Sequence, residues 1–169
     1  MCIMDLSEMI PKKTSRDDKI ISDIENNCIN VTYLRKRGKP IEVKINRYIH
    51  REIFLVGIAI WACEGTRRRI HELEMSNSSV NINQMYMSLL RELGIEQYAR
   101  FRVQALKDDV KSCEKFWEDC LGIKKIGKLI THIRKIRENS NGVVNIRINS
   151  TILRELFLYW AHILPDLLQ

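Results

Sequence analysis

The apolar stretch LVGIAIWACEGT, residues 55–66, limits the possible folds more than any other segment of this chain. Residues 53–63 carry no charge, so a helix here is apolar on every side and has to be buried on more than one side. The run is far shorter than the roughly 20 residues of a membrane helix. It closes on one carboxylate, Glu64, followed by Gly65, and glycine commonly stands just after a helix. We therefore expect a central helix over residues 51–65 of a globular domain.

The end of this helix carries two features beyond its hydrophobicity. Ala59, Ala62 and Cys63 are small, and small residues let two helix backbones approach closely. We expect one side of the helix to pack on its own sheet and these three residues to meet the same helix of a second copy across a twofold axis. The helix dipole disfavours a carboxylate at Glu64 by about 0.3–1 kcal/mol. Together with the last carbonyls, that of Cys63 among them, it makes an oxygen site suited to a divalent cation.

The remaining pattern predicts an α+β fold. Residues 29–34 and 41–45 form a hairpin around a basic turn with Gly38 and Pro40. After the central helix come a strand over 67–76, a helix from an Asn77 or Ser78 cap to Gly94, a strand over 98–106, a helix from Asp108 or Asp109 to Gly122, two strands within 124–149, and a helix from a Ser150 cap to just before Pro165. This order predicts one mixed sheet backed by helices on one face, within a domain of residues 28–169 whose leading hairpin spans 28–46. Residues 1–27 form a loosely held tail or a short helix from Ser15.

Charge indicates the kind of partner. The chain has 28 Lys and Arg against 21 Asp and Glu, a net charge of +7, which favours a polyanion such as DNA, RNA or an anionic membrane surface. Strand alternation places polar side chains on the exposed face of the sheet, and few acids stand among them. The candidate DNA-binding residues are Arg67, Arg69, His71, Arg100, Arg102, Gln104, Lys124, Lys125, Lys128, His132, Arg134, Asn145, Arg147 and Asn149. Arginine reads guanine and Gln or Asn reads adenine, while lysines suit phosphates. An ordinary solvated sheet face is the alternative.

Cysteine and histidine usage argues against disulfides and zinc. The five cysteines include no Cys-x-x-Cys pair, and the four histidines are scattered. Asp5 and Glu8 interrupt the N-terminus where a signal peptide needs an apolar core. We expect reduced thiols in a cytoplasmic protein that has no membrane segment.

The acid-glycine helix end followed by strand, helix and strand resembles the LAGLIDADG homing endonucleases. With the motif's last two residues on Glu64-Gly65, its central glycine falls on Ala59 and its second alanine on Cys63, while Ala62 replaces its first acid. MSNSS before a helix ending LLRELGI, and KPIEVKIN ahead of the motif helix, add to the likeness, which covers residues 28–164. Family members with one motif copy act as homodimers.

The resemblance implies a concave sheet that binds double-stranded DNA sequence-specifically and a Mg²⁺ ion held by Glu64 and the backbone carbonyl of Cys63. It implies a basic residue and a glutamine near the scissile phosphate, for which Lys128 and Gln104 are the candidates. Lys128 is otherwise a plain phosphate contact, Gln104 a base-reading residue, and Glu64 an ordinary helix end paired with Arg67, Arg68 or Arg69. The expected function is Mg²⁺-dependent cleavage of both DNA strands by a homodimer. The alternatives are a DNA-binding regulator or RNA-binding intron maturase on the same scaffold, and a protein-interaction module with an incidental basic face.

Overall fold

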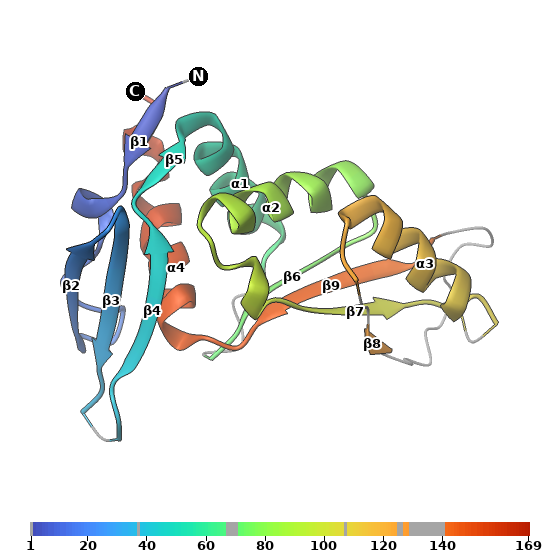
Figure 1. Cartoon of the computed structure of the whole chain (residues 1–169), viewed down its shortest axis with the longest axis horizontal. Coiled ribbons are helices and arrows are strands. Elements are labelled where there is room, and N and C mark those ends of the chain that lie inside the picture. The colour runs from blue at the N-terminus through green and yellow to red at the C-terminus, as the bar shows by residue number, and fades with distance from the viewer. Residues whose placement is uncertain (1, 37, 67–70, 107, 125–126, 129–140) are drawn as a thin grey trace.

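The computed structural model describes residues 2–36, 38–66, 71–106, 108–124, 127–128 and 141–169, with only the backbone of 127 and 128. These residues form an α+β fold with four α-helices and three small, mainly antiparallel sheets (Figure 1). In this part of the chain, no helix is both long and apolar enough to cross a membrane.

The N-terminal half is a β-layer beside the last helix. It contains β1 (Ile3–Asp5), the 3-10 helix η1 (Ser7–Met9), β2 (Lys19–Glu25), β3 (Cys28–Leu34), β4 (Ile41–Asn46) and β5 (Tyr48–His50). β2, β3 and β4 form one antiparallel sheet in that order, and β1 pairs with β5. The predicted hairpin is therefore confirmed as β3 and β4.

The expected helix from Ser15 is wrong, because residues 19–25 form β2. Asn26 and Asn27 both take positive φ angles, of 48° and 62°, and form a two-residue turn that returns the chain as β3. Asparagine adopts positive φ angles more readily than most residues, so the Asn26-Asn27 pair is a signal for a β-hairpin. The prediction of a helix from its cap residue overlooked this signal. Nor is the N-terminus a loose tail, because Leu6 and Met9 are buried in the core.

The second half contains α1 (Arg51–Glu64), β6 (Leu73–Asn77), α2 (Val80–Glu92), the 3-10 helix η2 (Glu96–Tyr98), β7 (Arg100–Gln104), α3 (Val110–Leu121), β8 (Gly127–Lys128), β9 (Val143–Ile148) and α4 (Thr151–Leu167). Its sheet has the order β6-β9-β7-β8, antiparallel except for the parallel pair β7–β8. The predicted α+β class is thus confirmed, but the single mixed sheet is wrong, because the strands divide into three separate sheets. Helices α2 and α3 lie over one of its faces (Figure 1).

Helix α1 packs mainly against α2 and α4, not on the sheet as expected. Trp61 meets Phe157 of α4 edge-to-face, with ring centroids 5.4 Å apart. On the α2 side, a Cβ atom on Gly57 would lie 2.6 Å from Cβ of Leu89, so only glycine allows this helix approach. A helix that is apolar on every side can be buried against any apolar neighbour. Its sequence therefore does not indicate which element it packs against.

Local signals placed the other helix ends to within a few residues. Ser79 caps α2 by accepting from the N–H of Ile82, one or two residues later than expected. Ser150 caps α4 and Gly122 ends α3 in the left-handed conformation (φ 64°), both as predicted. Helix α4 runs through Pro165 to Leu167 rather than stopping before it. The proline stands in the last, partly exposed turn, where losing one backbone hydrogen bond costs little.

Candidate nucleic-acid interface

The face of the β6-β9-β7 sheet opposite the helices is polar. Arg100 stands opposite Arg147, and Arg102 stands opposite Asn145, across the β7–β9 pair. Residues directly opposite share a face, and side chains alternate along a strand, so Gln104 joins them. The other face carries the apolar residues Val103, Val144, Ile146 and Met75, all buried. Arg100, Arg102, Gln104, Asn145 and Arg147 therefore share one face of the sheet, as predicted, and we call Arg100, Arg102, Gln104 and Arg147 the open face.

Acids are nevertheless part of this region, contrary to expectation. Arg147 Nη1 lies 3.0 Å from Oε1 of Glu72. On β6, Glu74 is opposite Arg147 and Ser76 is opposite Asn145. The Glu72 and Glu74 side chains therefore stand among the cations and reduce their net charge, because β6 contributes acids where the pattern had suggested only basic residues.

Asn145 is a structural residue rather than an outward-facing one. It is 2% exposed, and its Nδ2 donates to Glu74 Oε1 at 2.5 Å and to Ser76 Oγ at 2.8 Å. β9 is the inner strand between β6 and β7, so longer neighbours cover its short amide. Strand alternation determines which way a side chain points, but not whether its neighbours leave it reachable.

The other predicted contact residues divide between exposed and half-buried positions. Arg100, His71, Asn149 and Lys124 are exposed, while Arg102 and Gln104 are half-buried. The ring Nδ1 of His71 lies 2.9 Å from Oγ1 of Thr151. The described residues do not include Arg67, Arg69, Lys125, His132 and Arg134, and of Lys128 only the backbone is described, in β8.

Glu64 is exposed at the end of α1, where its Oε2 accepts a hydrogen bond of 3.2 Å from Nδ2 of Asn77. Gly65 has an ordinary extended backbone (φ −72°), so the sharp exit does not need left-handed geometry. Glycine is needed for space instead, since a Cβ would lie 2.5 Å from the Trp61 carbonyl oxygen. The N–H of Thr66 then donates to the carbonyl of Glu74 at 2.9 Å, which connects the helix end to β6.

One chain alone supplies only part of the ligand set that a Mg²⁺ ion at Glu64 needs. Its carboxylate and a last-turn carbonyl such as that of Cys63 are the hard oxygen atoms that Mg²⁺ prefers. Among the described residues, no cluster of three or more His, Cys, Asp or Glu is arranged to hold a metal ion. A Mg²⁺ ion here would therefore draw further oxygen ligands from water, nucleic-acid phosphates or a second copy of the chain.

The face of α1 that α2 and α4 leave uncovered is small and apolar. Val56, Ala59 and Cys63 follow at helical spacing from Glu52, and Val56 is 45% exposed. Val56 also lines one pocket with Met85 of α2, which is 50% exposed. Of the predicted interface residues, Ala59 and Cys63 lie on this uncovered stripe. Ala62 lies beside the stripe, one turn after the buried Ile58, and is half-buried like Ala59.

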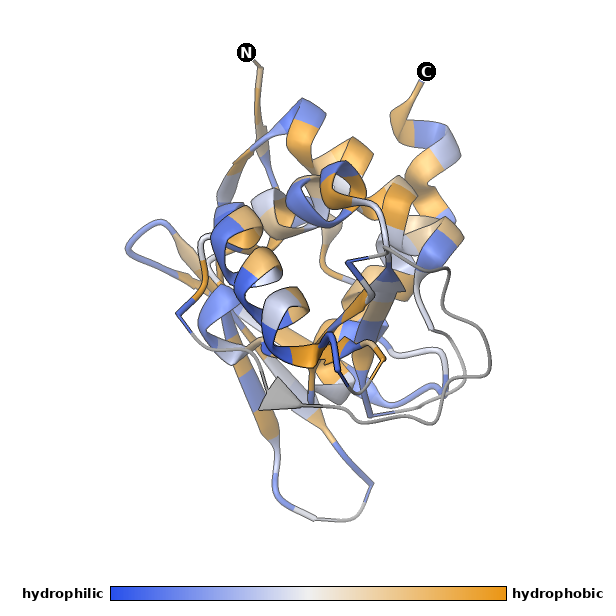
Figure 2. Ribbon diagram, turned by 90° about the vertical axis from the view of Figure 1, so that its right-hand side faces the viewer, coloured by the Kyte–Doolittle hydropathy of each residue, from blue (hydrophilic) through white to orange (hydrophobic). Residues whose placement is uncertain are grey.

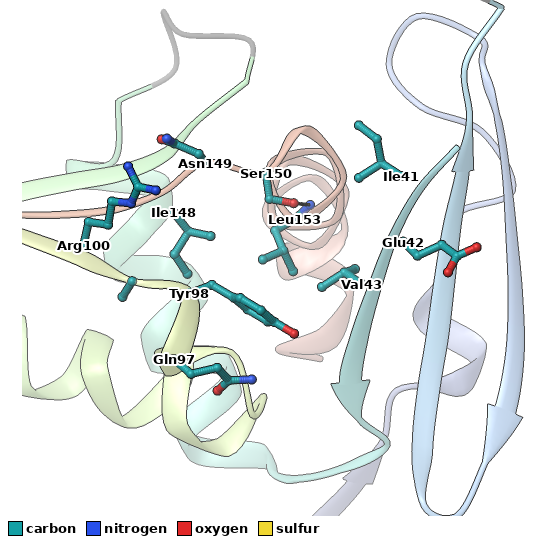
Figure 3. Close-up of a pocket in the computed structure, with 11 residues that line it drawn as sticks. Ile41, Glu42, Val43, Gln97, Tyr98, Arg100, Ile148, Asn149, Ser150 and Leu153 are labelled. Carbon is teal, nitrogen blue, oxygen red and sulfur yellow. Dashed lines mark hydrogen bonds between the residues drawn. The ribbon is translucent and has the colours of Figure 1, made fainter. Parts of the chain in front are cut away.

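A cleft of about 440 Å³ lies between β4 and the start of β7, where the two halves of the molecule meet. This cleft was not predicted from the sequence. Figure 3 shows the Tyr98 side chain pointing from η2 into this space towards Val43, with Arg100 and Asn149 at the sheet side. Because β4 and β7 are more than 50 residues apart, no local pattern could have indicated it.

Comparisons with protein-family models, with curated proteins and with solved structures find no match to this chain.

Proposed function

We propose that the protein binds double-stranded DNA through the open face. The observation that carries this proposal is the placement of Arg100, Arg102 and Gln104 at alternate positions of β7, on the face without helices. Arg100 is exposed, and Arg102 and Gln104 are half-buried beside it. The net charge of +7 adds a favourable long-range attraction to a polyanion.

The side-chain chemistry favours a duplex with readable base edges. Arginine donates two hydrogen bonds to guanine, and glutamine pairs with adenine in the major groove. Arg147 is paired with Glu72, so it contributes less positive charge to this face than Arg100 and Arg102. Arg100 and Lys124 are exposed and suit phosphate oxygens.

The uncovered stripe of α1 supports a homodimer as the binding unit. Val56, Ala59 and Cys63 present a small, apolar surface that a second copy of the helix would cover. In such a dimer the two helix ends, and with them the two Glu64 side chains, approach each other. A helix dimer that places two acids beside a DNA-binding sheet is also what the resemblance to the LAGLIDADG family implies.

Mg²⁺-dependent cleavage of DNA is a second candidate function. Two observations favour cleavage. Glu64 is exposed, and its described hydrogen-bond partner is the neutral amide of Asn77. Mg²⁺ at this end would supply charge stabilisation and a more acidic water. Glu64 would hold the ion, Gln104 would orient the substrate, and Lys128 is the candidate for neutralising phosphate charge.

A charge-reversal experiment tests DNA binding. The variant Arg100→Glu/Arg102→Glu is compared with Lys111→Glu/Lys115→Glu, whose two lysines are exposed on α3, over the opposite face of the sheet. The probe is a labelled pool of random-sequence duplexes titrated over a series of salt concentrations. We expect the first variant to lose about tenfold or more in affinity and the second to lose much less. Equal losses, or retention of structured RNA but not of the duplex, would contradict the proposal.

A further inference from the structure

The turn between β3 and β4 is the most basic short segment that the fold displays outside the open face. It has the sequence RKRGKP, residues 35–40, and no Asp or Glu occurs between residues 26 and 41. Arg35, Lys36 and Lys39 are exposed, and Arg37 lies outside the described residues. Gly38 has a φ angle of 98°, which favours glycine, and a Cβ atom added there would meet no other atom within 4 Å. We call Arg35, Lys36 and Lys39 the tip.

The tip projects to the same side as the open face. In Figure 1 the hairpin extends below the β6-β9-β7 sheet, away from α2 and α3. Figure 2, turned about the vertical axis, again shows this hairpin as the lowest part of the molecule. A duplex lying along the open face would therefore meet the tip at one end of the sheet.

The base of the hairpin lies near one end of the open face. Arg35 lines one pocket with His71, Glu72 and Asn149, the residues next to Arg147 at that end of the sheet. A partner that occupies the open face therefore comes close to the base of the hairpin.

The hairpin is a rigid support and not a loose loop. Strand β3 is paired on both sides, with β2 up to Leu34 and with β4 up to Tyr33 opposite Ile41. Val31 and Val43 are buried beneath it. Arg35 lies over the Tyr33 ring, with Cζ 5.8 Å from the ring centroid. The paired strands therefore hold the base of the turn in place.

Nearby acids leave the tip a net cationic surface. Asp17 is hydrogen-bonded to Lys13 at 2.6 Å, and its pKa is lowered mainly by that lysine and to a lesser degree by Lys36. Glu42 is exposed two residues after Pro40. The ion pairs within the described part of the chain include none to Arg35, Lys36 or Lys39.

We infer that the β3–β4 hairpin is an arm that binds the DNA backbone just outside the segment covered by the open face. This inference rests on the proposed function and extends it. Lysine and arginine on a short turn suit phosphate oxygens. The arm thus adds affinity and length to the binding site.

Duplex length separates the arm from the open face. Affinity is measured for one binding sequence in duplexes of increasing length, with wild-type protein, Arg35→Glu/Lys36→Glu, and the matched control Lys111→Glu/Lys115→Glu. We expect affinity of the wild type and the control to rise until the flanking DNA reaches the tip. The arm variant should stop gaining affinity at a shorter length. Its slope of log affinity against log salt should fall by about 2, since each lost phosphate contact removes about 0.9.

A second variant tests whether the first loses binding only because its hairpin is misfolded. Lys39→Glu changes the other side of the turn and leaves Arg35 on Tyr33, and it should reduce the salt slope by about 1. If both arm variants keep the wild-type length dependence and salt slope while Arg100→Glu/Arg102→Glu loses binding, the arm is wrong and the proposed function stands. If wild-type protein binds no duplex at low salt, both are wrong.

Discussion

Glu64 at the end of α1 and Asn77 at the end of β6 are joined by a hydrogen bond of 3.2 Å. The bond connects the end of the most apolar helix to the edge of the sheet that carries the open face. A backbone bond from Thr66 to Glu74 makes the same connection three residues from the end of β6. The position of the carboxylate relative to the sheet is thus determined by two independent contacts.

Glu64→Gln should separate binding from cleavage. The amide keeps the size of the side chain but is a weak ligand for Mg²⁺, so cleavage of a bound duplex should fall by about 100-fold or more while affinity changes little. Gel analysis of labelled DNA with Mg²⁺ measures the first, and titration in Ca²⁺ measures the second. Asp119→Asn, an exposed acid on α3, is the matched control. Failure of the wild type to yield products with defined ends would leave binding as the only function.

Val56→Arg should dissociate the homodimer. A charged side chain at the centre of the uncovered α1 stripe would be desolvated in the interface without a partner, whereas in the monomer it remains in water. Light scattering after size-exclusion chromatography, over a range of protein concentrations, reports the mass. Ile24→Arg is the control, because Ile24 is an apolar residue of similar exposure, 50% against 45%, on β2. A monomeric wild type at every concentration would contradict the dimer.

Asn145→Ala should destabilise the fold by about 1–3 kcal/mol, because Glu74 and Ser76 lose a buried donor. Urea unfolding measures the free energy of unfolding. Asn149→Ala, at an exposed position of the same region, should change it by less than about 0.5 kcal/mol. Equal effects of the two substitutions would show that the amide of Asn145 is not needed inside the sheet.

Gly57→Ala should also lower stability, although alanine is the better helix former by about 1 kcal/mol. The added Cβ would lie 2.6 Å from Cβ of Leu89, and forcing α1 and α2 apart costs about 1–3 kcal/mol. Thermal unfolding compared with that of Glu52→Ala, an exposed site on the same helix, isolates the packing effect. A rise in melting temperature for Gly57→Ala would mean that the two helices separate easily.

The Asp5–Arg47 pair predicts an acid-sensitive N-terminus. Hydrogen bonds from Arg47, and then from the N–H of Ser7, hold the pKa of Asp5 well below its ordinary value. A lowered carboxyl pKa contributes stability above the unfolded value, about 4, and that contribution is lost as the pH falls below it. Wild-type protein should therefore lose stability between about pH 5 and 2 more steeply than Asp5→Asn. Parallel pH profiles would show that the pair contributes nothing.

Local patterns in the sequence were sufficient to predict the helices and the residues that share the open face. Periodicity and caps located α1, α2, α3 and the start of α4, because a helix is stabilised by residues three or four apart in its own segment. The alternation of β7 and β9 likewise grouped Arg100, Arg102, Gln104, Asn145 and Arg147 on one face. These are local relationships, and a sequence states them directly.

Long-range packing decided the rest. Strand β2 forms because it pairs with β3. Asn145 is buried because β6 and β7 lie on either side of β9. Helix α1 packs on α2 and α4 because the tertiary structure brings their apolar surfaces against it. The projection of the basic hairpin beside the open face depends on how the two halves of the chain pack together. The sequence by itself determined the four helices, the β3–β4 hairpin and which side chains of β7 and β9 share a face. The tertiary structure alone decided which faces meet, because apolar burial has no direction and accepts any partner of suitable shape.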